Sequence, residues 1–319
     1  MELEYNVKSC DNNKTIKDIL LTNLHVSHRL LITLKKNNCI YLNNLPAFVY
    51  NVVSSGDIVK VSLNYEEDSS NIPAIKMDLD IIYEDDWYLV INKPSGIPVH
   101  PSFSHYKDSL SSGVKFYFDS IGLKKKIRPV NRIDKDTSGL VVFAKNEYIQ
   151  ECLINQMKNN QFYKEYLALC EGVFENKKDV IDLPITRKEN SIIERCVRDN
   201  GDNAITHYEV LKEVYLNNEG SAHCFDASTS KNLTDVSHLQ CFSVVKCILK
   251  TGRTHQIRVH MSHIGHPLLG DDLYGGSLDL LKRQALHSYK ISFIHPITQQ
   301  KLSFEATLPN DMLNLMLHS

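Results

Sequence analysis

The sequence lacks a strong net charge, which limits the kinds of partner it can bind through its whole surface. Its 36 Lys and Arg residues nearly balance its 38 Asp and Glu residues, so the formal net charge is −2. A near-neutral chain is not coated in positive potential, although it can hold a local basic cleft. The hydrophobic fraction of 42% and the charged fraction of 23% are typical of globular domains, which excludes wholesale disorder, collagen and coiled coil.

Long hydrophobic runs and paired cysteines are also missing. The longest apolar stretches, such as Leu140 to Ala144, are far shorter than the ~20 residues that cross a bilayer. The first ten residues contain two Glu and no apolar core, so we expect no export signal. The 8 cysteines include no Cys-x-x-Cys pair, which is typical of reduced thiols and argues against a zinc ribbon. We therefore expect a cytoplasmic protein that does not contact membranes.

The length of 319 residues predicts about two domains at the usual ~150 residues each. A small front module is indicated by helical patterns and short extended runs, at residues 15–22, 27–36, 39–42 and 58–63, with Ser27 as a helix cap. Residues 66–71 are acidic and Ser-rich and are typical of a linker. We predict a front domain with its linker at residues 1–75 and a larger domain at residues 76–319.

The larger domain is predicted to have an α+β fold. Apolar strand patterns occur at residues 87–91, 140–144, 163–170, 206–211, 243–249 and 289–294, and a helical pattern occurs at residues 147–157. Because these patterns lack regular βαβ alternation, we expect a mixed, largely antiparallel sheet flanked by helices and loops. The polar segment 216–240 is expected to be a surface insertion without evident chemistry.

The first candidate site is Asp134, in the segment RPVNRIDKDTSGLVVFAKN at residues 128–146. Asp134 precedes a buried strand directly, and loops at strand ends often carry catalytic groups. The same polar residues could simply form a turn. A calcium loop is not favoured because its twelfth position is Lys145 in place of Glu, and an aspartic-protease site would need a second copy of the turn.

The second candidate is Arg258, in the segment KTGRTHQIRVHMSHIGHPLLGDDLYGG at residues 250–276. We expect Thr254 to cap a helix that carries Arg258. An Arg within reach of a carboxylate keeps it ionised and fixes its direction, but an Arg on such a helix can equally be an ordinary buried ion-pair member.

Four histidines in the same segment make zinc an alternative, namely His255, His260, His263 and His266. No Cys, Asp or Glu within the helix completes a site, and Gly265 and Pro267 end the helix, so we expect no metal.

The third candidate is Tyr166, in the segment KEYLAL. Strand alternation puts Tyr166 and Ala168 on one face and Leu167 and Leu169 on the other. Tyr166 could be plain core packing, or an aromatic platform under a nucleobase that keeps a hydroxyl for proton transfer.

Together these segments resemble the RluA-type pseudouridine synthase family. The resemblance depends on NRIDKDTSGLVVFAKN, KEYLAL and TGRTHQIRVHMSHIGHPLLGDDLYGG in this order, with INKPSGIPVHP at residues 91–101 and QALHSYKISFIHP at residues 284–296. It covers the chain from about residue 80 to the end, apart from the segment 216–240. Members commonly have His or Gly at the position of Asn131 and Leu at that of Ile133. The front module resembles the S-four-type RNA-binding domain, through Val26 to Arg29 and Gly56 to Val59.

The resemblance implies an enzyme that isomerises uridine in RNA without a cofactor or a metal. The glycosidic bond is broken, the uracil turns while it stays bound, and it rejoins the ribose through C5. The resemblance makes Asp134 the catalytic aspartate, as nucleophile or as base, with Tyr166 as the active-site tyrosine and Arg258 as the partner of the aspartate. The expected substrate- or RNA-binding residues are Arg132, which would assist base flipping, Lys93, Thr137, Arg253, Gln256, Leu286 and Arg29. The basic run at residues 124–128 is also expected to contact RNA.

The leading hypothesis is therefore a cytoplasmic, monomeric RNA pseudouridine synthase that acts on rRNA or tRNA. A second hypothesis is a noncatalytic, ribosome-associated RNA-binding protein that retains the same fold. The intact Asp134, Tyr166 and Arg258 favour the enzyme. A third, a His-cluster metalloenzyme, predicts stoichiometric zinc.

Overall fold

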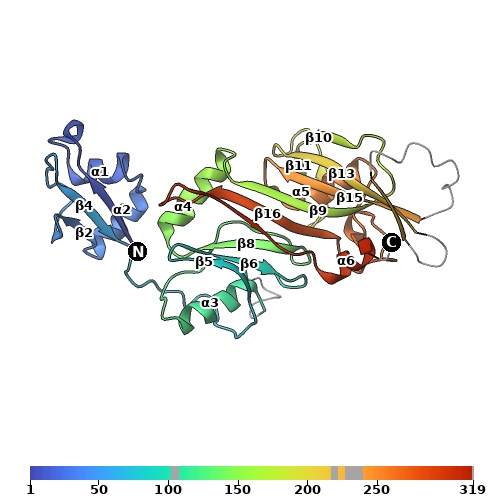
Figure 1. Cartoon of the computed structure of the whole chain (residues 1–319), viewed down its shortest axis with the longest axis horizontal. Helices are drawn as coiled ribbons and strands as arrows, with labels where there is room; N and C mark the ends of the chain where they lie inside the picture. Colours follow the sequence, from blue (N-terminus) through green and yellow to red (C-terminus); the bar gives the residue numbers. More distant parts are fainter. Residues whose placement is uncertain (102–107, 217–221, 227–239, 318–319) are drawn as a thin grey trace.

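The computed structural model describes residues 1–101, 108–216, 222–226 and 240–317. Two sheets dominate it, a four-stranded sheet near the N-terminus and an 11-stranded sheet in the remainder (Figure 1). The α+β prediction is confirmed. None of the described helices is long and apolar enough to cross a membrane.

The N-terminal module forms a small antiparallel sheet with two helices. Its strands are β1 (Glu2–Asn6), β4 (Ile58–Ser62), β2 (Ile40–Leu42) and β3 (Leu45–Pro46), in that spatial order. A 3-10 turn at Ser9–Asp11 precedes helix α1 (Ile16–Thr22) and helix α2 (His28–Lys36). Thr15 and Asp18 form a reciprocal capping box on α1, and Ser27 caps α2 as the sequence predicts. The side-chain oxygens accept hydrogen bonds from backbone amides of the first turn, which have no partner within the helix.

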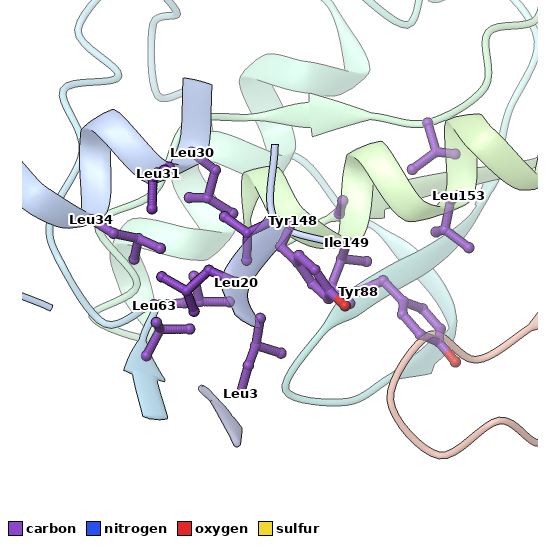
Figure 2. Packing of buried hydrophobic residues seen from close by; sticks show 14 of the residues in the cluster. Leu3, Leu20, Leu30, Leu31, Leu34, Leu63, Tyr88, Tyr148, Ile149 and Leu153 are labelled. Carbon is purple, nitrogen blue, oxygen red and sulfur yellow. The ribbon is translucent and has the colours of Figure 1, made fainter. Parts of the chain in front are cut away.

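The module packs directly on the larger domain through one continuous apolar cluster. Leu30 and Leu34 of α2 share this cluster with Tyr148 and Ile149 of helix α4 (Glu147–Lys158), as Figure 2 shows. All four side chains are buried. The module therefore lies at one end of the molecule, beside α4 (Figure 1).

The basic run at residues 124–128 holds the linker to the larger domain. The buried Lys125 ammonium donates to the carbonyls of Leu63 and Tyr65, and Arg128 forms a two-pronged bond with Glu67 at 2.6 and 2.8 Å. Lys125 and Arg128 thus bind groups of the protein itself, and the contact of this run with RNA stays a prediction.

The large sheet has the spatial order β10-β13-β15-β9-β16-β8-β6-β5, with β14, β17 and β7 attached to β13, β16 and β8. The strands are β5 (Asp80–Glu84), β6 (Tyr88–Lys93), β7 (Arg128–Pro129), β8 (Ser138–Ala144), β9 (Tyr163–Glu171), β10 (Lys178–Asp182), β13 (Ile205–Leu216), β14 (Ala222–Asp226), β15 (Gln240–Leu249), β16 (Leu286–Ile294) and β17 (Lys301–Glu305). Between neighbouring strands only the β16–β8 pair is parallel in the described chain, so the predicted antiparallel character is confirmed.

Each strand expected in the larger domain corresponds to one of these strands. The predicted insertion at residues 216–240 contains β14, which extends the sheet by pairing with β13. Residues 217–221 and 227–239 of that insertion lie outside the described residues.

The remaining elements cover the sheet and its ends. They are α3 (Leu110–Ser120), the small hairpin of β11 (Ile185–Arg187) and β12 (Arg195–Val197), α5 (Gln256–His263), a 3-10 turn at Asp272–Tyr274 and α6 (Asn310–Leu317). Strand β9 alternates as predicted: Tyr166 and Ala168 join the apolar cluster that contains Ile257 of α5, whereas Leu169 joins the cluster that contains Met312 of α6.

Candidate active site

A cavity of about 930 Å³ opens between β9, the loop before β8 and the loop that leads into α5. Asp134, Tyr166 and Arg258 all line it, although they are far apart in the sequence. Among the described lining residues, Asp134 is the one carboxylate, and six side chains are basic: Arg132, Lys158, Lys164, Lys250, Arg253 and Arg258. A chain of net charge −2 thus concentrates positive charge around a single carboxylate.

A buried asparagine ties the loop that carries Asp134 to strand β8. The Asn131 side chain donates to the carbonyl of Leu140 at 3.1 Å and accepts from the amide of Val142 at 2.9 Å. The amide of Thr137 closes the turn by donating to the carbonyl of Asp134 at 3.2 Å. Asn131, which departs from the family pattern, therefore acts on the packing of this loop.

Lys93 ties the same loop to the segment that follows β6. Its ammonium donates to the carbonyls of Pro94, Ile97 and Lys135 at 2.7 to 2.8 Å, and the side chain is completely buried. Burial lowers the pKa of Lys93 to about 7. All three donors thus hold the backbone around Asp134, and a contact of Lys93 with RNA stays a prediction.

Gly139 lets the loop enter the sheet. Its φ is +106°, and a β-carbon at this position would lie 2.3 Å from the carbonyl oxygen of Ser288 on β16. Only glycine accepts both this conformation and this approach. The start of β8 is thereby held against β16, directly after the turn that Asp134 begins.

Asp134 is held by an arginine that is itself held by a second aspartate. Arg258 Nη1 donates to Asp134 Oδ2 at 3.2 Å, while its Nε and Nη2 form a fork with the two carboxylate oxygens of Asp271 at 2.7 Å each. Arg258 and Asp271 are both buried. Burial opposes the charged form, but Asp271 and Asp134 outweigh it and raise the pKa of Arg258. The guanidinium is therefore a fixed positive charge that points at Asp134.

His255 and Tyr274 complete the surroundings of this carboxylate. His255 Nε2 lies 3.8 Å from Asp134 Oδ2, and its Nδ1 hydrogen-bonds the Tyr274 hydroxyl at 2.7 Å. The Arg258 guanidinium lies 4.9 Å from the centre of the Tyr274 ring. Burial lowers the pKa of His255, so the imidazole is neutral at pH 7 and Arg258 supplies the positive charge.

The start of α5 differs from the prediction. His255, with φ of 58°, occupies the cap position and no side chain caps the helix, so the expected Thr254 cap is wrong. The buried Gln256 side chain takes over: its oxygen accepts from Thr251 and Arg253, and its nitrogen donates to Ile205 and Thr206. The polar atoms of Gln256 therefore brace the loop, and its contact with RNA stays a prediction.

Tyr166 lies in the cavity wall with a buried side chain. Burial raises the pKa of Tyr166 to about 12, and the charge of Asp134 acts in the same direction. The phenol is therefore protonated at neutral pH.

The structure places the other expected RNA-binding residues in two groups. Arg132, Thr137, Arg253 and Leu286 line the cavity, with Arg132 exposed and Thr137 and Leu286 buried. Arg253 Nε donates to the carbonyl of Asn203 at 3.0 Å, and its Nη1 lies 3.5 Å from Asp202. Arg29 lies away from the cavity on the exposed side of α2.

Sequence reasoning gave no role to Asp271, Tyr274 or Lys164, although each lies within or beside a quoted motif. Their roles depend on contacts in three dimensions that the sequence does not reveal; for example, the two hydrogen bonds between Arg258 and Asp271 join residues on separate elements. Three of the four histidines considered for zinc bond protein groups: His255 bonds Tyr274, His260 bonds Thr206 and the carbonyl of Leu183, and His266 bonds the carbonyl of Glu171. In the described part of the chain, no three His, Cys, Asp or Glu side chains are grouped to hold a metal.

Comparisons with known proteins agree with this arrangement. The model of the RNA pseudouridylate synthase family matches residues 87–263. The RNA pseudouridine synthase YjbO of Bacillus subtilis is 37% identical over 294 residues, which cover 92% of this chain and 95% of the relative. Ribosomal large subunit pseudouridine synthase D of Xanthomonas campestris is 33% identical over 275 residues, 82% of this chain and 75% of the relative.

A solved structure shares the fold. Human RNA pseudouridylate synthase domain containing 1 superposes with a TM-score of 0.55 at 23% identity, over 76% of this chain and 86% of that chain. From the family match and the curated relatives, this chain belongs to the RNA pseudouridylate synthase family and is an isomerase that acts on uridine in RNA.

Proposed function

We propose that this enzyme converts specific uridines of large-subunit ribosomal RNA to pseudouridine, with Asp134 as the reacting carboxylate. The observation that supports this most strongly is the single carboxylate of a cation-rich cavity, held by Arg258. The choice of ribosomal RNA is supported by relatives such as ribosomal large subunit pseudouridine synthase D. We also propose that it acts in the cytoplasm, as a monomer and without a cofactor.

One carboxylate is sufficient for this chemistry. The reaction moves the uracil from N1 to C5 and takes up no water, so it needs no second carboxylate to activate one, in contrast to glycoside hydrolysis. Asp134 Oδ2 is bound by Arg258, and Oδ1 has no hydrogen-bond partner among the described residues. That oxygen is free to attack the sugar or to accept a proton. Arg258 places a positive charge beside the carboxylate in either case.

Tyr166 and Arg132 handle the base in this proposal. The Tyr166 ring offers an apolar platform on which uracil stacks, and its protonated hydroxyl donates a hydrogen bond while the ring turns. Arg132 is exposed at the cavity and takes the place of the base that leaves the RNA stack. Extrusion costs a few kcal/mol, which favours uridines in loops over those in regular duplex.

The front module, residues 1–75, is proposed to be an S-four-like RNA-binding domain joined to the catalytic domain of residues 76–319. Arg29 is exposed on α2, and Lys35 and Lys36 occupy the last turn of that helix. Because the module packs on α4 through a shared apolar cluster, its cations keep a fixed position relative to the catalytic domain. This arrangement suits a grip on RNA outside the cavity.

The test uses RNA that carries tritium at C5 of uridine. Pseudouridine formation replaces that tritium, so its release into water reports turnover. We expect release from ribosomal RNA of a strain that lacks this enzyme and none from transfer RNA. Release from transfer RNA alone would contradict the choice of substrate. RNA binding without release from either pool would instead favour the noncatalytic, ribosome-associated factor.

A further inference from the structure

Lys164 is a cation in the cavity wall that the proposed chemistry does not use. It lies on β9 two residues before Tyr166, so both side chains are on the same face of the strand and both line the cavity. Its side chain is partly buried. In the described part of the chain, its ammonium makes no hydrogen bond and no ion pair.

The loop opposite Lys164 leaves room for this ammonium. A β-carbon built on Gly252 would lie 3.3 Å from Lys164 Nζ, so the glycine keeps the space beside the nitrogen open. Lys250 and Arg253 flank Gly252 and also line the cavity. The acid in this corner is Asp202, which is exposed and lies 3.5 Å from Arg253. Lys164, Lys250 and Arg253 thus bring three positive charges to this corner, where the carboxylate that the described chain supplies is Asp202.

Burial lowers the pKa of Lys164, because the charged form is disfavoured away from water. A partly buried ammonium without a counter-charge is costly, and proteins normally pair such groups. An anion that entered the cavity with the substrate would supply this partner.

We propose that Lys164, with Lys250 and Arg253 beside it, binds a phosphodiester of the RNA strand next to the target uridine. This inference depends on the proposed function, since it takes the cavity as the site of that uridine. Two residues along a strand span about 6.5–7 Å, which matches the separation of a stacked base from its own backbone. A phosphodiester supplies the full negative charge that a uracil carbonyl lacks. Lys164 is thus a positioning residue.

The experiment compares Lys164→Met and Lys164→Arg with wild type and with Lys178→Met. Lys178 is an exposed lysine at the start of β10 that does not line the cavity, and so serves as the matched control. KM for the RNA substrate is measured by tritium release over a series of salt concentrations. We expect Lys164→Met to raise KM about tenfold or more and to reduce the slope of log KM against log salt by about 0.7–0.9. Lys164→Arg should recover most of both values, and Lys178→Met should match wild type.

Two outcomes would overturn the subsite. One is wild-type KM and salt slope in Lys164→Met, and the other is a fall confined to kcat with KM unchanged. RNA binding by Asp134→Asn, with and without Lys164→Met, gives the salt slope without turnover. A wild-type enzyme that releases no tritium contradicts the proposed function. The salt dependence of RNA binding by the two Asp134→Asn proteins still shows whether Lys164 contacts a phosphate.

Discussion

Asp271 is the residue whose replacement tests most sharply how the reacting carboxylate is held. Asp271→Asn keeps the shape of the side chain but removes its charge and one of the two acceptors that fork Arg258 at 2.7 Å. The Arg258 side chain is 8% exposed and that of Asp271 is 1% exposed, so the lost charge leaves a buried cation with Asp134 as its remaining partner.

The expected loss has two parts. Breaking a buried ion pair costs about 3 kcal/mol at the lower end of its usual range, which lowers Tm by roughly 6–12 °C for a domain of this size. Arg258 also loses the partner that directs it, and a misplacement near 1 Å costs about 100-fold in turnover. We therefore expect kcat to fall about 100-fold beyond any effect of unfolding.

Asp311→Asn provides the matched control. Asp311 forms the same kind of fork with Arg283, at 2.7 Å on both prongs, but its side chain is 40% exposed and does not line the cavity. A pair whose carboxylate reaches solvent contributes about 0.2–1 kcal/mol, so this variant should keep its kcat and nearly its Tm. Single-turnover tritium release and thermal melts measure both variants below their Tm. Wild-type kcat in Asp271→Asn would refute the reasoning that Asp271 directs Arg258 at Asp134.

Two further predictions concern the loop around Asp134. Gly139→Ala should lower the free energy of unfolding by at least ~2 kcal/mol, because a β-carbon would lie 2.3 Å from the Ser288 carbonyl in a left-handed conformation; an unchanged urea midpoint would contradict this. The pKa of Lys93 is about 7 in the folded protein and ~10.4 in the unfolded chain. Between these pH values the unfolded chain binds more protons than the folded protein, so the free energy of unfolding rises with pH. The rise should be smaller in Lys93→Met, as urea midpoints at successive pH values would measure; equal slopes for both proteins would refute it.

The motif residues could be found from the sequence because their chemistry is local. Asp134 begins a turn that leads into a strand, Tyr166 alternates within a strand, and Arg258 lies on a helix, and all three line one cavity. Their catalytic roles stay predictions. The cap of α2 by Ser27 was also predictable, since it depends on residues within one turn.

Burial and long-range pairing were not predictable. The residues around Lys93 and Lys125 in the sequence are typical of solvent-exposed lysines. In the structure, backbone carbonyls distant in the sequence accept hydrogen bonds from both ammonium groups. Gln256 replaces Thr254 in bracing the entry to α5, because it reaches the backbone of β13 51 residues earlier. Helix α3 was missed because its sequence LSSGVKFYFDS contains three Ser and one Gly, residues of weak helix propensity, and its stability comes from packing.

The most direct test of the central claim is single-turnover tritium release by Asp134→Asn beside RNA binding by the same variant. Asparagine keeps the shape of the side chain and removes the charge and the nucleophile. We predict that release falls below detection while the dissociation constant for ribosomal RNA stays within about threefold of wild type, a difference under ~1 kcal/mol. Appreciable turnover by Asp134→Asn would contradict the assignment of the reacting group.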